Sequence, residues 1–279
     1  MPTSVLAITD PLPSLAAWTD CFRNADIPVM TATAVALEAM RANEDDVDAN
    51  LVGEMTASDP LMTLKVMAHA ASVRPQRIVT ETETVTAALV MMGISPFFRA
   101  FGPQPTVEER LHDAPEALSG LQEVLRRAHR AANFALGFAV HRMDHDAAVI
   151  HQAALLHDFA EMLLWCHAPA LALHIFREQR ADPALRSSVV QQAVLKVQLP
   201  DLQQSLMHAW RLPQLLKDIT NDRHAEHPSA KSVVLAIRLA RHTAHGWDNA
   251  ALPDDVHDIG SLLNLSDAAT LQLLHELDT

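Results

Sequence analysis

The chain of 279 residues contains no Tyr and only 7 Gly, although 49% of its residues are hydrophobic. Glycine provides the left-handed backbone conformations of tight turns, and aromatic residues favour strands. Their scarcity disfavours β-hairpins, while the many Ala and Leu residues favour helices. No stretch of useful length alternates polar and apolar residues. The sequence therefore predicts an all-α fold.

Cysteine and long apolar runs are also scarce. The two cysteines, Cys21 and Cys166, cannot form a disulfide framework, and they indicate a reducing, cytoplasmic compartment. The N-terminus has no basic segment leading into an apolar run, so we expect no signal peptide. The longest apolar stretch, 87–101, contains a glycine, a proline and an arginine. It is too short and too interrupted to span a bilayer, so we expect no membrane association.

Basic side chains are outnumbered, with 21 Lys and Arg against 34 Asp and Glu and a net charge of −13. Proteins that bind nucleic acid need a basic surface to neutralise phosphates, so this balance argues against a nucleic-acid partner. Arg126, Arg127 and Arg130 lie close together in the sequence, around His129. Such a cluster could bind a phosphate-bearing ligand or form a solvated helix face.

Helical spacing of apolar residues, with prolines at expected helix starts, divides the chain into helices. In the first part of the chain we expect helices over residues 15–24, 31–41, 46–57, 61–71, 80–92 and 95–101. A long helical pattern follows over 107–143, interrupted near Pro115. The segment GPQPT, 102–106, has turn composition. It predicts a boundary between an N-terminal helical lobe, 1–105, and a second helical lobe, 106–279.

One helix of the N-terminal lobe has a well-defined start. Asp59 precedes a proline, and proline is favoured in the first turn of a helix, so Asp59 is expected to cap the helix that follows. The apolar stripe of this helix contains Leu61, Leu64 and Val66 or Met67. We expect these side chains to be buried against the next helix.

The run AALLHDFAEMLLW, 153–165, contains the adjacent pair His157–Asp158 within an apolar segment of helical spacing. Burial of a histidine and an ionisable aspartate is costly unless both have partners. A metal ion or a hydrogen-bond network would provide them. We expect one helix through this run, with Asp144 as its cap.

Several segments together resemble the HDOD domain family. DPLMTLKVMAHAAS, 59–72, is similar to the pattern DPxLxxxLLxxANS, and ALVMMG, 88–93, resembles the end of the next helix. LLHDFAEMLLW resembles the HD signature, WRLP, 210–213, resembles a W-x-LP element, and 231–244 resembles the closing helix. The resemblance covers roughly 27–244. It implies an all-helical fold related to the HD superfamily of metal-dependent phosphohydrolases, with an HD-like second lobe. It further implies a role in bacterial signalling, commonly without hydrolase activity.

The same resemblance implies a metal site. Its ligands in this chain would be His129, His157 and Asp158, with water completing the shell around Fe, Mn, Ni, Zn or Mg. The superfamily's late aspartate would fall in SVVLAIRLARHTA, 232–244, which contains no acid and has Arg238 and Arg241 at its polar positions. Arginine repels a cation. We therefore interpret the three residues as a hydrogen-bonded remnant without a cofactor, and a bound divalent metal is the alternative.

Two positions next to the pair depart from the family pattern LLHDIGK, since its Gly is Ala160 and its Lys is Glu161. Glu161 lies three residues after Asp158, on the same helix face. It either contributes a carboxylate to a remodelled site or points into solvent.

Other residues could carry chemistry, each with a simpler structural explanation. The candidate pairs are His141 with His145, His224 with His227 near Asp222 and Glu226, and Cys166 with His167. The first pair has a chelating spacing but is interrupted by an expected helix break, and the second lies in a polar segment. Adjacency of Cys and His in sequence does not make a catalytic dyad, because that pairing is spatial.

The sequence thus predicts a non-catalytic regulatory protein in signal transduction. Its expected partner is a signalling protein or a small anionic ligand. The alternative is a metal-dependent phosphohydrolase acting on a nucleotide or a cyclic dinucleotide. The two hypotheses differ in whether the chain provides a complete set of metal ligands, which only the phosphohydrolase requires.

Overall fold

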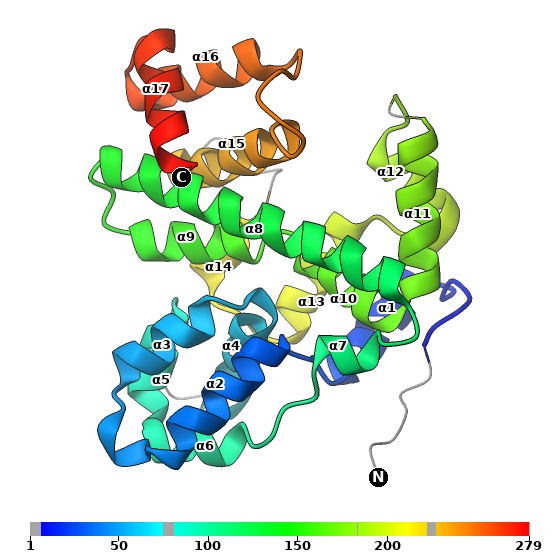
Figure 1. The fold of residues 1–279 in the computed structure, drawn as a ribbon, viewed down its shortest axis with the longest axis vertical. Helices are drawn as coiled ribbons and strands as arrows, with labels where there is room; N and C mark the ends of the chain where they lie inside the picture. The colour runs from blue at the N-terminus through cyan, green and yellow to red at the C-terminus, as the bar shows by residue number, and fades with distance from the viewer. Residues whose placement is uncertain (1–6, 75–80, 183, 222–226, 279) are drawn as a thin grey trace. The chain divides into compact units, whose positions relative to one another are not determined.

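The computed structural model describes residues 7–74, 81–182, 184–221 and 227–278, and their regular secondary structure is helical (Figure 1). An isolated parallel bridge pairs Val29 with Thr106, and no strand occurs within these ranges. The prediction of an all-α fold is confirmed.

The helices form two compact units, which interleave along the chain. The first contains described residues of Met1–Pro75, Val85–Val124 and Asp158–Leu212, and the second those of Gln76–Thr84, Leu125–His157 and Pro213–Thr279. The first unit contains residues from both sides of the expected boundary at 102–106. The division into helical lobes 1–105 and 106–279 stays a prediction.

The helices of the first unit are α1 (Leu15–Asn24), α2 (Thr31–Ala42), α3 (Ala49–Ala57), α4 (Pro60–Val73), α5 (Val85–Met92), α6 (Ile94–Ala100), α7 (Val107–Arg110), α10 (Phe159–His167), α11 (Pro169–Ala181), α12 (Ser187–Leu195) and α13 (Leu199–Ala209), with the 3-10 helix η1 (Glu44–Asp46). Helix α8 (Pro115–His141) begins in the first unit and ends in the second. The second unit also contains α9 (Ala147–Leu155), α14 (Gln214–Ile219), α15 (Pro228–His242), α16 (Leu252–Leu263) and α17 (Asp267–Leu277).

Helix α4 begins where the sequence predicts, because Asp59 caps it. Asp59 Oδ1 accepts hydrogen bonds from the backbone N–H groups of Leu61 at 2.9 Å and Met62 at 3.3 Å. These are two of the donors that a helix N-terminus leaves without partners. Asp59 Oδ2 accepts from the N–H of Met30 at 2.8 Å, which ties the start of α2 to α4. The apolar stripe of α4 is buried, Leu64 included, and α4 packs against α5, as predicted.

In the rest of the first unit, α10 packs against α4, α11 and α13, and α1 packs against α13. Trp18 on α1 is fully buried, and its indole N–H donates to the carbonyl oxygen of Leu195 at 3.1 Å. Buried tryptophan usually requires such a partner. The hydroxyl oxygens of Thr19 and Ser205 lie 2.8 Å apart between α1 and α13. This unit is therefore fixed by apolar packing with a few satisfied polar groups.

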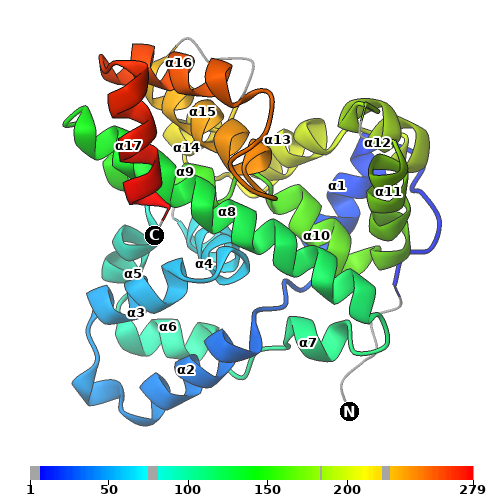
Figure 2. The same ribbon diagram turned by 45° about the horizontal axis from the view of Figure 1, so that its top comes forward.

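In the second unit, α15 packs against α9, α14 and α16, and α17 packs on α16 (Figures 1 and 2). Gly137 on α8 lets α17 approach closely. A Cβ atom placed on Gly137 would lie 2.6 Å from Cδ2 of Leu277, closer than such atoms can pack. The C-terminal helix is therefore seated on the second half of α8.

The run 153–165 is not one helix, which corrects the prediction. Helix α9 ends at Leu155 and α10 begins at Phe159, so the His157–Asp158 pair lies in the turn between them. The physical reason is packing, since α9 packs against α14 and α15, whereas α10 packs against α4, α11 and α13. One continuous apolar run thus contributes to two different cores, and the chain turns between them.

The expected cap is also displaced. Asp146, not Asp144, occupies the N-cap position of α9, and Asp144 Oδ1 accepts from the N–H of Asp146 at 3.1 Å.

No single described helix is long and apolar enough to cross a membrane. Among the described residues, one pair of helical segments, Ala147–His167 and Pro169–Ala181, has sufficient combined length and apolar composition, but the two segments are bent by 118° relative to each other.

Candidate functional site

The His157–Asp158 pair is buried, as predicted, with each residue 8% exposed. His129 lies on α8 and is half-buried. All three residues have interaction partners, as buried polar groups require. That His129 lies beside the pair, and that the three form the remnant of a metal site, stays a prediction.

A further histidine lies near His129. Burial lowers the pKa of His151 below its usual value, and the neighbouring His129 lowers it further. His151 lies on α9, so imidazoles from α8 and α9 are close enough to interact. The sequence pattern does not single out His151, because its spacing from His157 does not fit one helix face.

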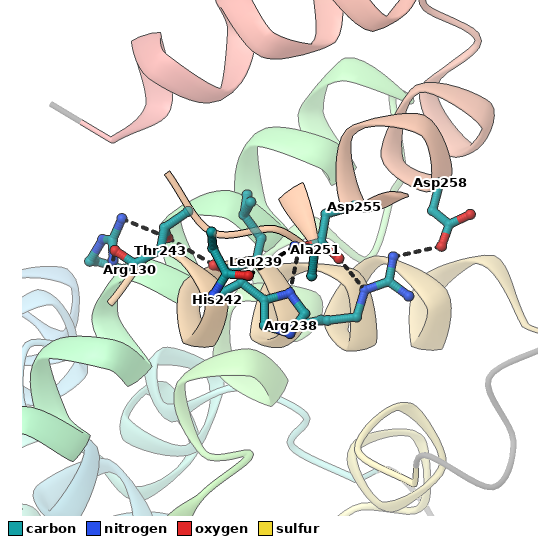
Figure 3. A network of polar contacts seen from close by, with 9 residues as sticks. Arg130, Arg238, Leu239, His242, Thr243, Ala251, Asp255 and Asp258 are labelled. Atoms are coloured by element: carbon teal, nitrogen blue, oxygen red, sulfur yellow. Dashed lines mark hydrogen bonds and ion pairs between the residues drawn. The ribbon is translucent and has the colours of Figure 1, made fainter. Parts of the chain in front are cut away.

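Helix α15, where the resemblance would place the superfamily's late aspartate, carries an ion-pair network (Figure 3). Arg238 Nε lies 2.6 Å from Asp255 Oδ1, and its Nη2 donates to Asp258 Oδ2 at 2.6 Å. The second oxygen of Asp255, Oδ2, lies 2.6 Å from Nδ1 of His242. The side chain of Asp255 is 2% exposed. The buried carboxylate that meets α15 is therefore bound on both oxygens by residues of α15.

Asp255 and Asp258 lie on α16, beyond α15, and neither was among the predicted site residues. A signal was present in the segment PDDVHD, 253–258, which concentrates acids directly after the helix that carries Arg238 and Arg241. Helix periodicity does not say which of these acids faces a neighbouring helix. The path of the loop between α15 and α16 decides that.

Within the predicted arginine cluster, Arg130 is already paired with an acidic side chain. Arg130 donates from Nε and Nη2 to the two oxygens of Asp278, each at 2.7 Å. Its Nη1 also donates to the carbonyl oxygen of Thr243 at 3.1 Å, and its Nη2 to the Thr243 hydroxyl at 2.9 Å. Such a bidentate pair fixes both position and orientation. Arg130 therefore anchors the end of α17, and Trp247 donates to the same carboxylate at 3.1 Å.

Cys166 and His167 have structural environments. Burial raises the pKa of the Cys166 thiol to about 12, which leaves it protonated and unreactive near neutral pH. Burial, followed by the nearby Arg110, lowers the pKa of His167 to about 4. Nη1 of Arg110 donates to Nδ1 of His167 at 3.0 Å. The neutral imidazole therefore accepts a hydrogen bond from a cation, and no nucleophile–base pair results.

The His141–His145 pair does not share one helix face. Helix α8 ends at His141, and Met143 then adopts a left-handed conformation with φ 54°. Both histidines are exposed. The helix break that the sequence predicts between them is confirmed, and it removes the i, i+4 geometry that chelation on a helix requires.

In the second histidine pair, His227 has a local structural role. Its side chain accepts a hydrogen bond from the N–H of Ser229 at 3.3 Å, and it caps α15. The other residues of that hypothesis, Asp222, His224 and Glu226, lie outside the described residues.

The described side chains show no grouped set of ligands for the metal implied by the HD superfamily. Within residues 7–74, 81–182, 184–221 and 227–278, no three His, Cys, Asp or Glu side chains are grouped so that they could hold a metal ion. Glu161, half-buried in the first turn of α10, does not complete such a group. We therefore derive no reaction step through a metal.

Comparison with known proteins identifies the family. The family model of the HDOD domain matches residues 27–226, which is most of the chain. The chain belongs to the HDOD family. The match covers α2 to α14, so α15, α16 and α17 of this HDOD protein lie beyond it.

Solved structures share the fold of this HDOD protein. MmoQ response regulator from Methylococcus capsulatus str. Bath is similar with a TM-score of 0.66 at 18% identity, over 89% of this chain and 98% of that one. A fragment of MmoQ gives a TM-score of 0.62 at 16% identity, over 84% and 91% of the two chains. A virulence factor from Campylobacter jejuni subsp. jejuni gives 0.61 at 14% identity, over 95% and 98%. No curated protein matches this chain.

Proposed function

We propose that this HDOD protein acts in signal transduction through contacts with a signalling protein or a small anionic ligand, and that it does not hydrolyse phosphate esters. Membership of the HDOD family supports a signalling role. One structurally similar protein is described as a response regulator. The proposal places this chain in the same kind of process.

The observation that carries the non-hydrolytic part is the ion pair between Arg238 and Asp255. Hydrolysis by HD proteins needs a metal that activates water and polarises a phosphoryl oxygen. In this chain α15 contains Arg238 and Arg241 but no acid, and the buried carboxylate that reaches it is bound to Arg238 and His242. A carboxylate that already neutralises a guanidinium is a poor metal ligand, because binding a metal would leave the arginine unpaired.

The position of Glu161 supports the same conclusion. It adds a negative charge three residues after Asp158, where the family pattern has a lysine. An anionic phosphate approaching the pair would be repelled by that carboxylate. Electrostatic stabilisation of the transition state is often the largest catalytic contribution, so this exchange of charge disfavours phosphoryl chemistry.

The burial of His157 and Asp158 favours one alternative, a metal-dependent phosphohydrolase acting on a nucleotide or a cyclic dinucleotide. Both residues are 8% exposed, and such a pair is suited to bind a divalent cation. Elemental analysis of the purified protein separates the two hypotheses. Near-stoichiometric Fe, Mn, Ni or Zn would support the alternative.

The decisive experiment measures turnover of phosphomonoesters, nucleotides and cyclic dinucleotides with added Mn²⁺, Fe²⁺, Ni²⁺ or Mg²⁺. We expect no turnover above a buffer control. Turnover that disappears in His157→Ala and Asp158→Asn variants, with unchanged circular dichroism, would overturn the proposal. Asp258→Asn is the matched control, because this exposed carboxylate lies outside the pair. Turnover that survives in all three variants would indicate a contaminating enzyme.

A further inference from the structure

A cavity of about 420 Å³ lies in the first unit, lined by residues near the C-terminal ends of three helices. Arg23 comes from α1, His69 and Ser72 come from α4, and Trp210 and Arg211 come from the end of α13. The volume lies within the range of small-molecule sites. No residue of the α15–α16 ion-pair network lines the cavity, and neither His157 nor Asp158 does.

Arg211 occupies a backbone position that normally favours glycine. Its φ angle is 56°, in the left-handed region. The N–H of Arg211 donates to the carbonyl oxygen of His208, and the N–H of Leu212 donates to that of Met207, each at 3.0 Å. These two bonds form a Schellman motif, in which glycine fits the left-handed position with least strain. An arginine in this conformation is more strained than glycine would be, as are Lys196 and Asn264 at the ends of α12 and α16.

The two guanidinium groups of the cavity lack acidic partners. Among the parts of the chain that the structure describes, neither Arg23 nor Arg211 forms a side-chain hydrogen bond or an ion pair. Both residues are exposed. In a chain with a net charge of −13, two unpaired cations at one cavity form a local positive site.

Helix ends at the cavity offset only part of this charge. The C-terminal end of a helix carries about half a negative charge, so three ends amount to roughly −1.5. The two guanidinium groups therefore leave the cavity net positive. An arginine whose only role is to complement the negative end of the helix dipole could occupy any unstrained position of the last turn. Arg211 instead lies just beyond the end of α13.

The other lining residues complement an anion that has a flat body. Trp210 is half-buried, with its ring 5.8 Å from that of Phe159, and its N–H donates to the carbonyl oxygen of Arg23 at 3.4 Å. Burial lowers the pKa of His69, so it is neutral at pH 7 and has one N–H to donate. Ser72 donates its hydroxyl proton to the carbonyl oxygen of His69 at 2.7 Å, so it is not the donor to the anion.

We propose that this cavity binds a small organic phosphate, with the phosphoryl group between Arg23 and Arg211 and a flat ring against Trp210. A phosphomonoester carries close to two negative charges at pH 7, which matches two unpaired guanidinium groups better than a single carboxylate does. The aromatic ring provides the surface for an apolar body. This binding site rests on the proposed function, since it gives a class to its small anionic ligand, and it does not depend on whether the His157–Asp158 pair is catalytic.

The test is isothermal titration calorimetry of the full chain at low ionic strength with phenyl phosphate as the probe. Inorganic phosphate and phenol are titrated separately, because they carry the charge and the ring alone. We expect phenyl phosphate to bind at millimolar or lower concentration and more tightly than either. Absence of phenyl phosphate binding, or equal binding of phenol, would overturn the proposal.

Two variants test the assignment of the arginines. Arg211→Gly is expected to weaken phenyl phosphate binding at least tenfold while the melting temperature is unchanged or raised, because glycine relieves the left-handed strain. Arg23→Gln is expected to weaken binding by a similar factor. The matched control is Arg180→Gln, which removes an exposed positive charge on α11 outside the cavity, and it is expected to leave binding within twofold.

Two results would contradict this assignment. If Arg211→Gly and Arg23→Gln lower the melting temperature without weakening binding, the arginines only complement helix ends. If Arg180→Gln weakens phenyl phosphate binding as much as the two cavity variants do, the anion is attracted by the surface charge in general, and the cavity is not the binding site. Either result leaves the non-hydrolytic signalling proposal intact, since that depends on metal content and turnover.

Discussion

Arg238 and Asp255 form an ion pair in which Nε of the guanidinium lies 2.6 Å from Oδ1 of the carboxylate, joining α15 to α16. Asp255→Asn is expected to lower the free energy of unfolding by about 1–3 kcal/mol, because it removes the charge that Arg238 and His242 share. The effect is limited because the side chain of Arg238 is 35% exposed and keeps Asp258 as a partner. Urea denaturation measures it.

Asp258→Asn is the control for this prediction. Asp258 contacts the same guanidinium but its side chain is 47% exposed, so its loss is expected to cost below about 1 kcal/mol. If Asp255→Asn and Asp258→Asn lowered the free energy of unfolding equally, burial of the carboxylate would not determine the strength of these ion pairs.

Leu64 on α4 is fully buried. Leu64→Ala is expected to lower the free energy of unfolding by about 2–5 kcal/mol, through lost apolar burial and a residual cavity. Met91→Ala is the comparison, since Met91 on α5 is 56% exposed, and it is expected to change stability by less than about 0.5 kcal/mol. Chemical denaturation of both variants is the measurement, and a Leu64→Ala effect as small as that of Met91→Ala would refute the assigned core.

Gly120 on α8 lies against the ring of the buried Trp165. A Cβ atom at position 120 would lie 2.7 Å from Cζ2 and 2.8 Å from Cζ3 of that ring. Gly120→Ala is therefore expected to destabilise the protein by about 1–3 kcal/mol. This is the opposite of the effect at an exposed helix position, where replacing glycine with alanine stabilises a helix by about 1 kcal/mol. Gly102→Ala, where a Cβ would meet no atom within 4 Å, is expected to be neutral or stabilising. A higher melting temperature for Gly120→Ala would contradict the packing.

His167 predicts a dependence of stability on pH. Its pKa is about 4 in the folded protein and about 6.5 when unfolded. Between these values the unfolded chain binds more protons than the folded one, so the contribution of His167 is complete above pH 6.5 and is lost as the pH falls towards 4. Over this interval the free energy of unfolding is expected to fall on the order of 3 kcal/mol. His167→Gln keeps an acceptor for Arg110 but does not titrate, so its unfolding free energy should fall less steeply over that interval. Identical pH profiles would show that His167 does not cause the slope.

Local sequence determined the helices and several of their ends. The Asp59 cap accepts from the N–H groups of Leu61 and Met62, two and three residues further on, so this start of α4 is set by neighbouring residues. The interruption of helix near Pro115 and the break after His141 are equally local. Family patterns spread over the chain, from 59–72 to 210–213, were sufficient to indicate the HDOD fold.

Tertiary structure decided the turn at His157–Asp158. The run 153–165 has no glycine or proline, so its composition predicts one helix. The chain turns because α9 and α10 pack into different cores, and the free energy gained in two cores outweighs the helical hydrogen bonds lost at the turn. Periodicity cannot reveal this, because both halves are apolar.

The partners of the charged residues were likewise beyond the reach of sequence. Arg130 and Asp278 are 148 positions apart, yet they form a bidentate pair. Arg211 joins Arg23 at one cavity only because α1 and α13 end there. Sequence sets each helix and the residue types on its faces through interactions within a turn or two. Which faces meet is decided by the burial of all the helices together, and so the ion pairs and the cavity follow from the fold alone.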